Sequence, residues 1–284
     1  MKSRVIILGF GGKSINGRLG VAIGDMGELV FIGLGLYDDK DLTLRAVEEA
    51  KKCEMLFAEF YTSSLRGADL SKLEERLGGK IRILTREDVE KGDVIVSEAA
   101  TKRVGFLVAG DPMTATTHVD LRLRAARQGI ATCVVHGVSI LTAAAGLLGL
   151  QAYKFGRTVT IPFQEERFKP TSPYELLSQN RQAGLHTLVL LDLKEGGNYM
   201  KANEAIGYLL EKEREMKFGA FTEDSVVCVL ARVGSEKPLV VAGRARKMEG
   251  QDFGGPLHCL VVPGRLHFAE REALIMLAGA PGDI

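Results

Sequence analysis

The stretch "LVAGDPMTATTHVDL" (residues 107–121) decides the fold of this chain. It begins as an apolar strand, stops at Gly110, Asp111 and Pro112, passes three threonines and then adopts the apolar spacing of a helix. A strand that turns directly into a helix is the unit from which α/β sheets are built. An ordinary turn of this kind needs only a glycine and a capping residue, so the additional residues predict that this turn also contacts a ligand.

An earlier stretch, "FIGLGLYDDKDLT" (residues 31–43), repeats the pattern of apolar strand, glycine, acid and a threonine that opens a helix. In a parallel sheet both turns lie at the carboxyl edge, where ligands bind in the crevice at a topological switch point. Gly33, Gly35 and Gly110 are expected to let a ligand approach the main chain. The missing third glycine of a dinucleotide fingerprint argues against a nicotinamide site.

Three polar side chains at such turns admit two interpretations. Asp111 offers a carboxylate acceptor for hydroxyl or amino groups, but Asp38 and Asp111 can equally organise turns or cap helices. In "VVHGVSILTAAAG" (residues 134–146), Ser139 opens a helix whose free N–H groups can hold a carboxylate or a base edge. A plain N-cap role for Ser139 fits the sequence as well.

Short β-rich runs alternate with helical patterns in the first half of the chain. This alternation predicts a mainly parallel sheet with helices on its faces. Strands are expected at residues 29–34, 55–60, 81–85, 94–97, 104–109 and 131–135, and helices at 41–53 and 117–129.

The pattern changes after residue 135, where strands partly follow one another through short turns. Adjacent strands of this kind are usually antiparallel, so a mixed sheet is expected. Strands are expected at residues 158–162, 186–193, 225–232, 238–243 and 258–263, with one long helix at 201–216.

The predicted fold class is therefore α/β, with two α/β domains and a ligand cleft between them. The N-terminal domain spans residues 29–135 and the C-terminal domain spans residues 136–284. Residues 1–28 contain seven glycines and little periodicity, so they are interpreted as an N-terminal extension or the product of an upstream start codon. An added hairpin on the sheet is the alternative.

Net charge, the length of apolar runs and the spacing of cysteines and histidines limit the functions that this chain can have. A net charge of +1 argues against a broad polyanion-binding surface, and no apolar run approaches the ~20 residues that cross a bilayer, so neither nucleic acid nor membrane is an expected partner. The four cysteines lack metal or disulfide spacing and are interpreted as buried thiols of a cytoplasmic protein. The five histidines show no metal-ligand spacing, and no local nucleophile motif occurs.

Several stretches together resemble the diphthine synthase family. The broader turns "GLGLYD" and "GDP" indicate the tetrapyrrole-methylase-like superfamily of class III S-adenosylmethionine-dependent methyltransferases, while "AEFYTS" and "ATTHVDLR" narrow the resemblance to diphthine synthases. It extends from about residue 29 to the end. The stretches that carry it are residues 31–63, 110–125, 153–163, 184–194 and 258–274.

The resemblance implies a cytoplasmic, homodimeric methyltransferase of diphthamide biosynthesis. The donor is S-adenosyl-L-methionine, which leaves as S-adenosyl-L-homocysteine, and no metal takes part. The acceptor is the amino nitrogen of the aminocarboxypropyl-modified histidine of translation elongation factor 2. Two alternatives remain open: a methyltransferase of corrin or porphyrin precursors, and a non-catalytic module that binds an S-adenosyl ligand.

The resemblance also implies where the donor binds. Several of the implied residues are apolar and are expected to act through their main chain, and no catalytic residue is assigned. The implied donor-binding residues are Leu36, Asp111, Thr114, Ser139, Ile140, Leu191, Ala231 and His258.

Overall fold

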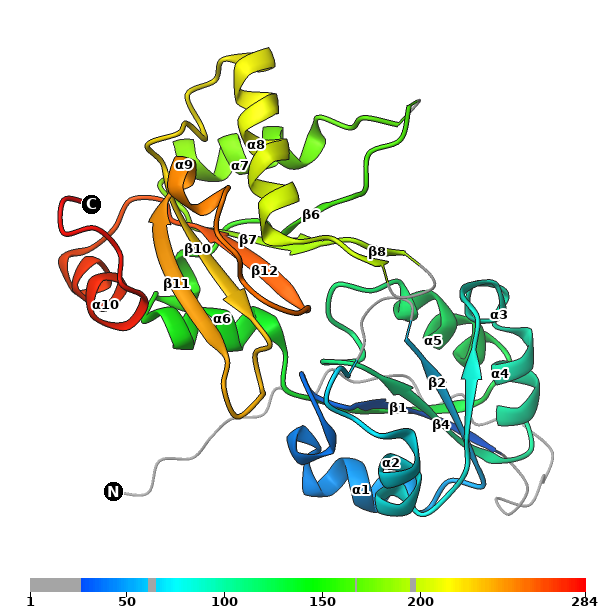
Figure 1. The fold of residues 1–284 in the computed structure, drawn as a ribbon. Coiled ribbons are helices and arrows are strands. Elements are labelled where there is room, and N and C mark those ends of the chain that lie inside the picture. Colours follow the sequence, from blue (N-terminus) through cyan, green and yellow to red (C-terminus); the bar gives the residue numbers. More distant parts are fainter. Residues whose placement is uncertain (1–26, 61–64, 167, 195–197) are drawn as a thin grey trace, which may run out of the picture.

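The computed structural model describes residues 27–60, 65–166, 168–194 and 198–284. Two five-stranded sheets, each covered by helices, form the two halves of the molecule (Figure 1). Of the predicted N-terminal extension, residues 1–26 lie outside the described part, so neither interpretation of that segment is tested. The α/β class and the two-sheet organisation predicted from the sequence are confirmed.

The first sheet is entirely parallel, with strand order β3-β2-β4-β1-β5. Because β1 lies between β4 and β5, the turns that follow these three strands share one edge of the sheet. The strands are β1 (Glu28–Gly33), β2 (Met55–Glu59), β3 (Ile81–Leu84), β4 (Arg103–Val108) and β5 (Ala131–Val135).

Helices cover both faces of this sheet and bury its apolar strands. One face packs against Ala46 and Ala50 of α1 and Leu73 and Leu77 of α2. The other face packs against the helices that follow β3 and β4. The first pair is α1 (Leu44–Ala50) and α2 (Leu70–Leu77), and the second group is α3 (Arg86–Lys91), α4 (Asp93–Ala99) and α5 (His118–Arg127).

The strand predicted at residues 94–97 is wrong, because this segment belongs to helix α4. Gly92 adopts a left-handed φ of +66°, ends α3 and lets a new helix begin at once. Ile95, Val96 and Ala99 are the buried residues of α4, which is the spacing of a helix face. A short apolar run does not distinguish a strand from a buried helix, and here the packing decides.

The second sheet is mixed, as predicted, with strand order β11-β10-β12-β7-β6. β6 pairs with β7 in parallel, while the other pairs are antiparallel. The strands are β6 (Val159–Ile161), β7 (Thr187–Leu191), β10 (Val226–Ala231), β11 (Leu239–Arg244) and β12 (His258–Val262).

Helices again cover both faces of the second sheet (Figure 1). The predicted long helix is α8 (Ala202–Met216), which packs on one face with α7 (Ser172–Gln182) and α9 (Ala245–Met248). The other face packs against α6 (Ile140–Leu148) and α10 (Phe268–Ala278). Short elements complete the fold: the 3-10 turns η1 (Asp39–Asp41) and η2 (Ala152–Lys154), and the hairpin β8 (Leu193–Lys194) with β9 (Asn198–Tyr199).

The chain crosses between the two sheets after β5, because α6 packs on the second sheet. We propose the division at residues 135/136 on this basis. Further contacts link the halves, among them the Arg66 guanidinium 5.2 Å from the Tyr199 ring centroid and the exposed ion pair of Lys40 with Glu236.

A buried polar network holds the C-terminal half together at the end of the sheet opposite to the β7 carboxyl end. The Glu270 carboxylate, 1% exposed, accepts hydrogen bonds from the Gln151 N–H, from the His267 N–H and from Lys154. His186 Nδ1 accepts the Gly264 N–H, so its Nε2–H donates to Glu270 at 3.0 Å. Burial opposes ionisation, but these hydrogen bonds outweigh it and lower the pKa of Glu270 to about 2.

The remaining sequence expectations concern cysteines and membranes. All four thiols are free; Cys228 and Cys259 are buried as expected, whereas Cys53 and Cys133 are only partly buried. Within the described ranges, no helix combines the length and apolarity that crossing a membrane requires.

Candidate functional site

The two glycine-containing turns found in the sequence bind each other directly. The Gly110 N–H donates to the Gly35 carbonyl at 2.6 Å, and the Gly35 N–H donates to the Gly110 carbonyl at 3.3 Å. Both residues have a positive φ, +74° for Gly110 and +85° for Gly35, which glycine adopts without a steric cost. The parallel sheet therefore fixes the two turns as one unit at its carboxyl edge.

The turn after β5 packs against this unit through a third glycine. A Cβ atom on Gly137 would lie 2.2 Å from the Gly110 carbonyl oxygen and 2.9 Å from Gly33 Cα. Gly33 is therefore needed for backbone packing. The space beside Gly35 that a Cβ would occupy is filled by Asp41, whereas no atom lies within 4 Å of the Cβ position of Gly110. Of the three glycines predicted to admit a ligand, only Gly110 faces open space.

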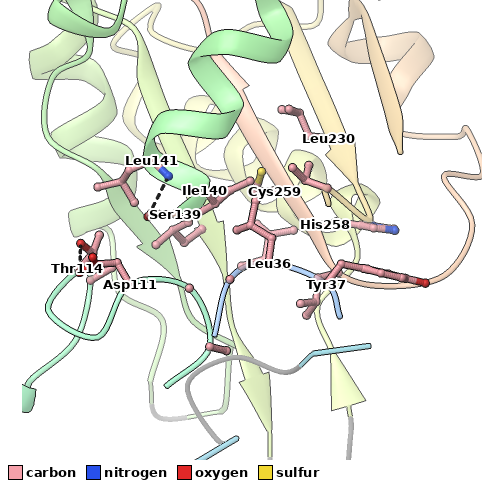
Figure 2. A pocket seen from close by; sticks show the side chains of 18 of the residues that line it. Leu36, Tyr37, Asp111, Thr114, Ser139, Ile140, Leu141, Leu230, His258 and Cys259 are labelled. Carbon is pink, nitrogen blue, oxygen red and sulfur yellow. Dashed lines mark hydrogen bonds between the residues drawn. The ribbon is translucent and has the colours of Figure 1, made fainter. Parts of the chain in front are cut away.

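A cavity of about 170 Å³ lies where these turns meet the second sheet (Figure 2). Residues from both halves line it, and its wall is mainly aliphatic. The lining residues are Gly35, Leu36, Tyr37, Val108, Ala109, Gly110, Asp111, Thr114, Ala115, Thr116, Ser139, Ile140, Leu141, Leu190, Leu191, Leu193, Leu230, Arg232, Val233, Leu257, His258 and Cys259.

Asp111 both organises its turn and lines the cavity. Oδ1 accepts the Met113 N–H and the Thr114 hydroxyl, each at 3.0 Å, and Oδ2 accepts a hydrogen bond from His136 Nδ1 at 2.7 Å. Burial tends to raise the pKa of Asp111, but the bonds from Met113, His136 and Thr114 outweigh it and lower that pKa. The turn-organising interpretation of Asp111 is thus correct without excluding a role toward a ligand.

Two acids serve the other turn differently. Asp38 accepts the Lys40 N–H and caps η1, so it organises the turn and does not line the cavity. Asp41, which the sequence argument did not single out, accepts the N–H groups of Leu36 at 3.0 Å and Tyr37 at 2.8 Å. Asp41 therefore holds the cavity-lining main chain in place.

The predicted threonine and serine caps differ from one another. Thr43 accepts the Ala46 N–H and caps α1, and Ser139 accepts the Leu141 N–H at 3.3 Å and caps α6 at the cavity wall (Figure 2). Thr117 occupies the N-cap position of α5 but makes no side-chain capping bond.

The second sheet contributes a row of residues across three strands. Leu230 of β10 is the register partner of Cys259 in β12, which in turn is the register partner of Leu190 in β7. Ala231 pairs with His258 one position further along. Because the row runs across the strands, residues about thirty positions apart or more in sequence meet at one wall.

His258 is a neutral imidazole in this wall. Its Nδ1 accepts the Ala202 N–H at 3.2 Å, so Nε2 carries the hydrogen and donates to the Gly255 carbonyl at 2.9 Å. Burial lowers the pKa of His258, and the nearby charges of Arg232 and Lys201 act in the same direction. The ring therefore adds no positive charge to the cavity.

Two features at the cavity indicate that the site is built for a ligand. Thr116 Oγ1 is buried and finds no hydrogen-bond partner among the described residues. Ala115 and Arg232, both in the lining, adopt left-handed φ values of +54° and +53°. Such backbone conformations cost of order 1–3 kcal/mol and gather at ligand sites.

Comparison with known proteins places this geometry in a family. Residues 28–248 match the tetrapyrrole (corrin/porphyrin) methylases. The chain is 46% identical over 254 residues to a diphthine synthase of Methanothermobacter thermautotrophicus, which covers 89% of this chain and 96% of the relative. It is 48% identical over 250 residues to a diphthine synthase of Methanocaldococcus jannaschii, with 87% and 97% covered.

A solved crystal structure of a diphthine synthase superposes with a TM-score of 0.82 at 35% identity, covering 90% of this chain and 97% of that one. The chain belongs to the diphthine synthase family. The resemblance drawn from the sequence is confirmed, and membership of the diphthine synthases within the methylases makes the protein a methyltransferase.

The cavity of this diphthine synthase family member gathers most of the residues implied for donor binding. Seven of the eight lie in its lining, and Ala231 lies between two lining residues, Leu230 and Arg232. Sequence reasoning missed Tyr37, Thr116 and Arg232, although the turn "GLGLYD" and the threonine run already contained the first two.

No group of three or more metal-ligating side chains occurs in the part of the chain that the structure describes. Burial raises the pKa of Cys259 to about 12, so its thiol stays protonated beside the cavity.

Proposed function

We propose that the protein transfers methyl groups from S-adenosyl-L-methionine to the amino nitrogen of the aminocarboxypropyl-modified histidine of translation elongation factor 2. S-Adenosyl-L-homocysteine is the product of the donor. One observation carries the proposal: the hydrogen-bonded Gly35–Gly110 turns and the row on the second sheet enclose a single cavity. The diphthine synthase relatives give the acceptor class.

The residues of the cavity fit an adenosyl ligand. Leu36, Ile140 and Leu191 offer aliphatic surface from both halves for a flat base. The unpartnered Thr116 hydroxyl and the main chain at the glycine turns offer hydrogen bonds to polar edges. Leu36, Asp111, Thr114, Ser139, Ile140, Leu191, Ala231 and His258 are the residues that we propose to hold the donor.

The bound donor supplies a methyl group on a sulfonium, which is a good leaving group. The protein contributes mainly by holding acceptor and donor in line, an effect that reaches about 7–11 kcal/mol in favourable cases. His258 stays neutral and avoids repulsion of the cationic donor, and the protonated Cys259 thiol does not compete for the methyl group.

We further propose that the enzyme is cytoplasmic, because its proposed acceptor is a factor of the translation machinery. We also propose that it acts as a homodimer and without a metal. The cavity lies between the two halves and is partly open to solvent, which suits an acceptor carried on another protein. The net charge of +1 supports a protein acceptor over nucleic acid.

The decisive experiment incubates the protein with radiolabelled donor and elongation factor 2 that carries the unmethylated aminocarboxypropyl group. Transfer of label to the factor is expected. Label transfer to an anionic tetrapyrrole precursor instead would favour the alternative substrate, and donor binding without transfer to either acceptor would favour a binding module.

Asp111→Ala is expected to weaken donor binding at least about tenfold, because the variant loses three hydrogen bonds that shape the cavity wall. Isothermal titration calorimetry with the donor measures this directly. Asp38→Ala is the matched control, since Asp38 caps the neighbouring turn outside the cavity. Unchanged donor affinity in Asp111→Ala contradicts the assigned site.

A further inference from the structure

The pair formed by Asp111 and His136 has a chemical use that the turn does not require. Asp111 is 9% exposed and lines the cavity, whereas the His136 side chain is 77% exposed. His136 itself is not among the lining residues, so the pair runs from the cavity wall outward to solvent. An acceptor that is a side chain of another protein has to arrive from that solvent side.

The hydrogen bond fixes which ring nitrogen of His136 carries the hydrogen. Its hydrogen bonds lower the pKa of Asp111, so the carboxylate is ionised at neutral pH and can only accept. His136 Nδ1, 2.7 Å from Asp111 Oδ2, must then be the donor. In the neutral ring this leaves a lone pair on Nε2, which has no hydrogen-bond partner within the described ranges.

Contacts within the protein support this arrangement on both sides of the pair. His136 directly follows β5, and its neighbour Gly137 is pressed against Gly33 and Gly110. Asp111 is tied to its own turn through Met113 and Thr114. The direction of the His136 ring is therefore set by contacts that do not involve a ligand, as a preorganised catalytic group requires.

Methylation of an amine needs such a group, because an ammonium ion has no lone pair with which to attack. Resting on the function proposed above, we propose that His136 Nε2 accepts the proton of the acceptor amine, and that Asp111 is the positioning residue that presents it. The charged group in contact with the His136 ring is Asp111.

The ammonium gives one proton to His136 Nε2, and the freed lone pair of nitrogen forms a bond to the methyl carbon. The carbon–sulfur bond breaks with its electron pair going to sulfur, which changes the sulfonium into a neutral thioether. The product is again an ammonium, so each further methylation needs the same proton transfer after His136 has released its proton to solvent.

Paired variants separate proton transfer from structural support. His136→Asn places an amide N–H near the position of Nδ1 and can keep the bond to Asp111, whereas His136→Ala removes both functions. We expect both variants to lower kcat on the elongation factor by about 100-fold with little change in donor affinity. An Asn variant with wild-type kcat beside an impaired Ala variant overturns the proposal, because it assigns His136 a bracing role only.

The pH profile supplies a readout that a structural role would not change. In His136→Asn, kcat is expected to keep rising with pH because the solution must then deprotonate the amine, and added imidazole is expected to restore activity to His136→Ala. A profile of the same shape in wild type and His136→Asn contradicts proton transfer by His136. His267→Asn makes the same substitution at a helix N-cap, a position where Asn is tolerated, and serves as the control.

A measurement without acceptor keeps this test separate from the proposed function. In ¹⁵N-histidine-labelled wild-type protein, NMR is expected to show His136 in the Nδ1–H tautomer, with that preference lost in Asp111→Asn. An Nε2–H tautomer in wild type overturns the proposal. Failure of wild-type protein to methylate the factor would instead reject the proposed function, whatever the tautomer.

Discussion

The two halves of the molecule build one cavity in different ways. The parallel sheet contributes three turns at its carboxyl edge, joined through the main chain of Gly35, Gly110 and Gly137. The mixed sheet contributes side chains from a row across β7, β10 and β12, which includes Leu230 and Cys259. The first wall is shaped by backbone conformation and the second by strand register.

This difference shows why the two walls should respond differently to substitution. The turn wall depends on glycines such as Gly35 and Gly137, where neighbouring atoms leave no space for a Cβ. The strand wall belongs to a sheet whose stability draws on the polar network around Glu270, which lies at the end of the sheet away from the cavity.

Gly137→Val should disrupt the turn wall. Its Cβ would lie 2.2 Å from the Gly110 carbonyl oxygen, and backbone on both sides prevents relaxation. We expect a loss of about 3 kcal/mol or more in the free energy of unfolding together with loss of donor binding. Urea denaturation and donor calorimetry measure the two effects.

The control for this prediction is another glycine of the same region. Gly146 lies in helix α6 with no atom within 4 Å of its Cβ position, so Gly146→Ala should stabilise the protein by up to ~1 kcal/mol. A Gly137→Val variant as stable as the wild type would show that the close approach does not constrain this wall.

Glu270→Ala should weaken the second sheet and leave the cavity intact. It leaves the buried His186 and the partly buried Lys154 without their carboxylate, so a loss of about 3 kcal/mol is expected. At neutral pH the donor affinity should stay at the wild-type value, because the network lies at the opposite end of β7 from Leu191. Glu272→Ala, on the exposed side of α10, is the control.

Acid dependence provides a second readout for Glu270. Its folded-state pKa of about 2 lies below the ordinary 4.5, so the carboxylate contributes stability above pH 4.5 that is lost as the pH falls toward 2. Burial also lowers the pKa of His186, which adds to the loss as the pH falls below 6.5. Equal acid sensitivity of wild type and Glu270→Ala in thermal melts would rule out this assignment.

Asp41→Asn should have the smallest effect, confined to the turn wall. The neutral amide accepts the N–H groups of Leu36 and Tyr37 less strongly than the carboxylate, so a loss of about 1 kcal/mol in donor binding is expected. Glu236→Gln breaks the exposed pair with Lys40 and should leave donor binding unchanged. Similar affinities in both variants would show that Asp41 does not shape the cavity.

Much of the first half could be predicted because its signals are local. Each parallel strand is followed by its own turn, so glycine, acid and threonine appear together in "GLGLYDDKDLT" and "AGDPMTATT". The strand predicted at residues 94–97 failed because four apolar-rich residues carry no decisive period, and packing made them a helix.

The second wall could not be derived from local pattern. Leu191, Ala231 and His258 lie in ordinary strands, and only the resemblance to diphthine synthases singled them out. The roles of Asp41 and His136 were missed for a related reason. Asp41 accepts a hydrogen bond from the Tyr37 main chain and His136 donates one to Asp111, and the spacing of residues in the sequence does not indicate either bond.

The sequence by itself determined the alternation of strands and helices, the parallel and mixed character of the two halves, and the family. These features depend on periodicity and turn residues, which are local in the sequence. Tertiary structure alone decided that Gly35 and Gly110 bind each other, that Gly137 closes against them, and that Asp111 points His136 toward solvent. The physical reason is distance along the chain: strand order and register bring together groups whose mutual contact no local propensity encodes.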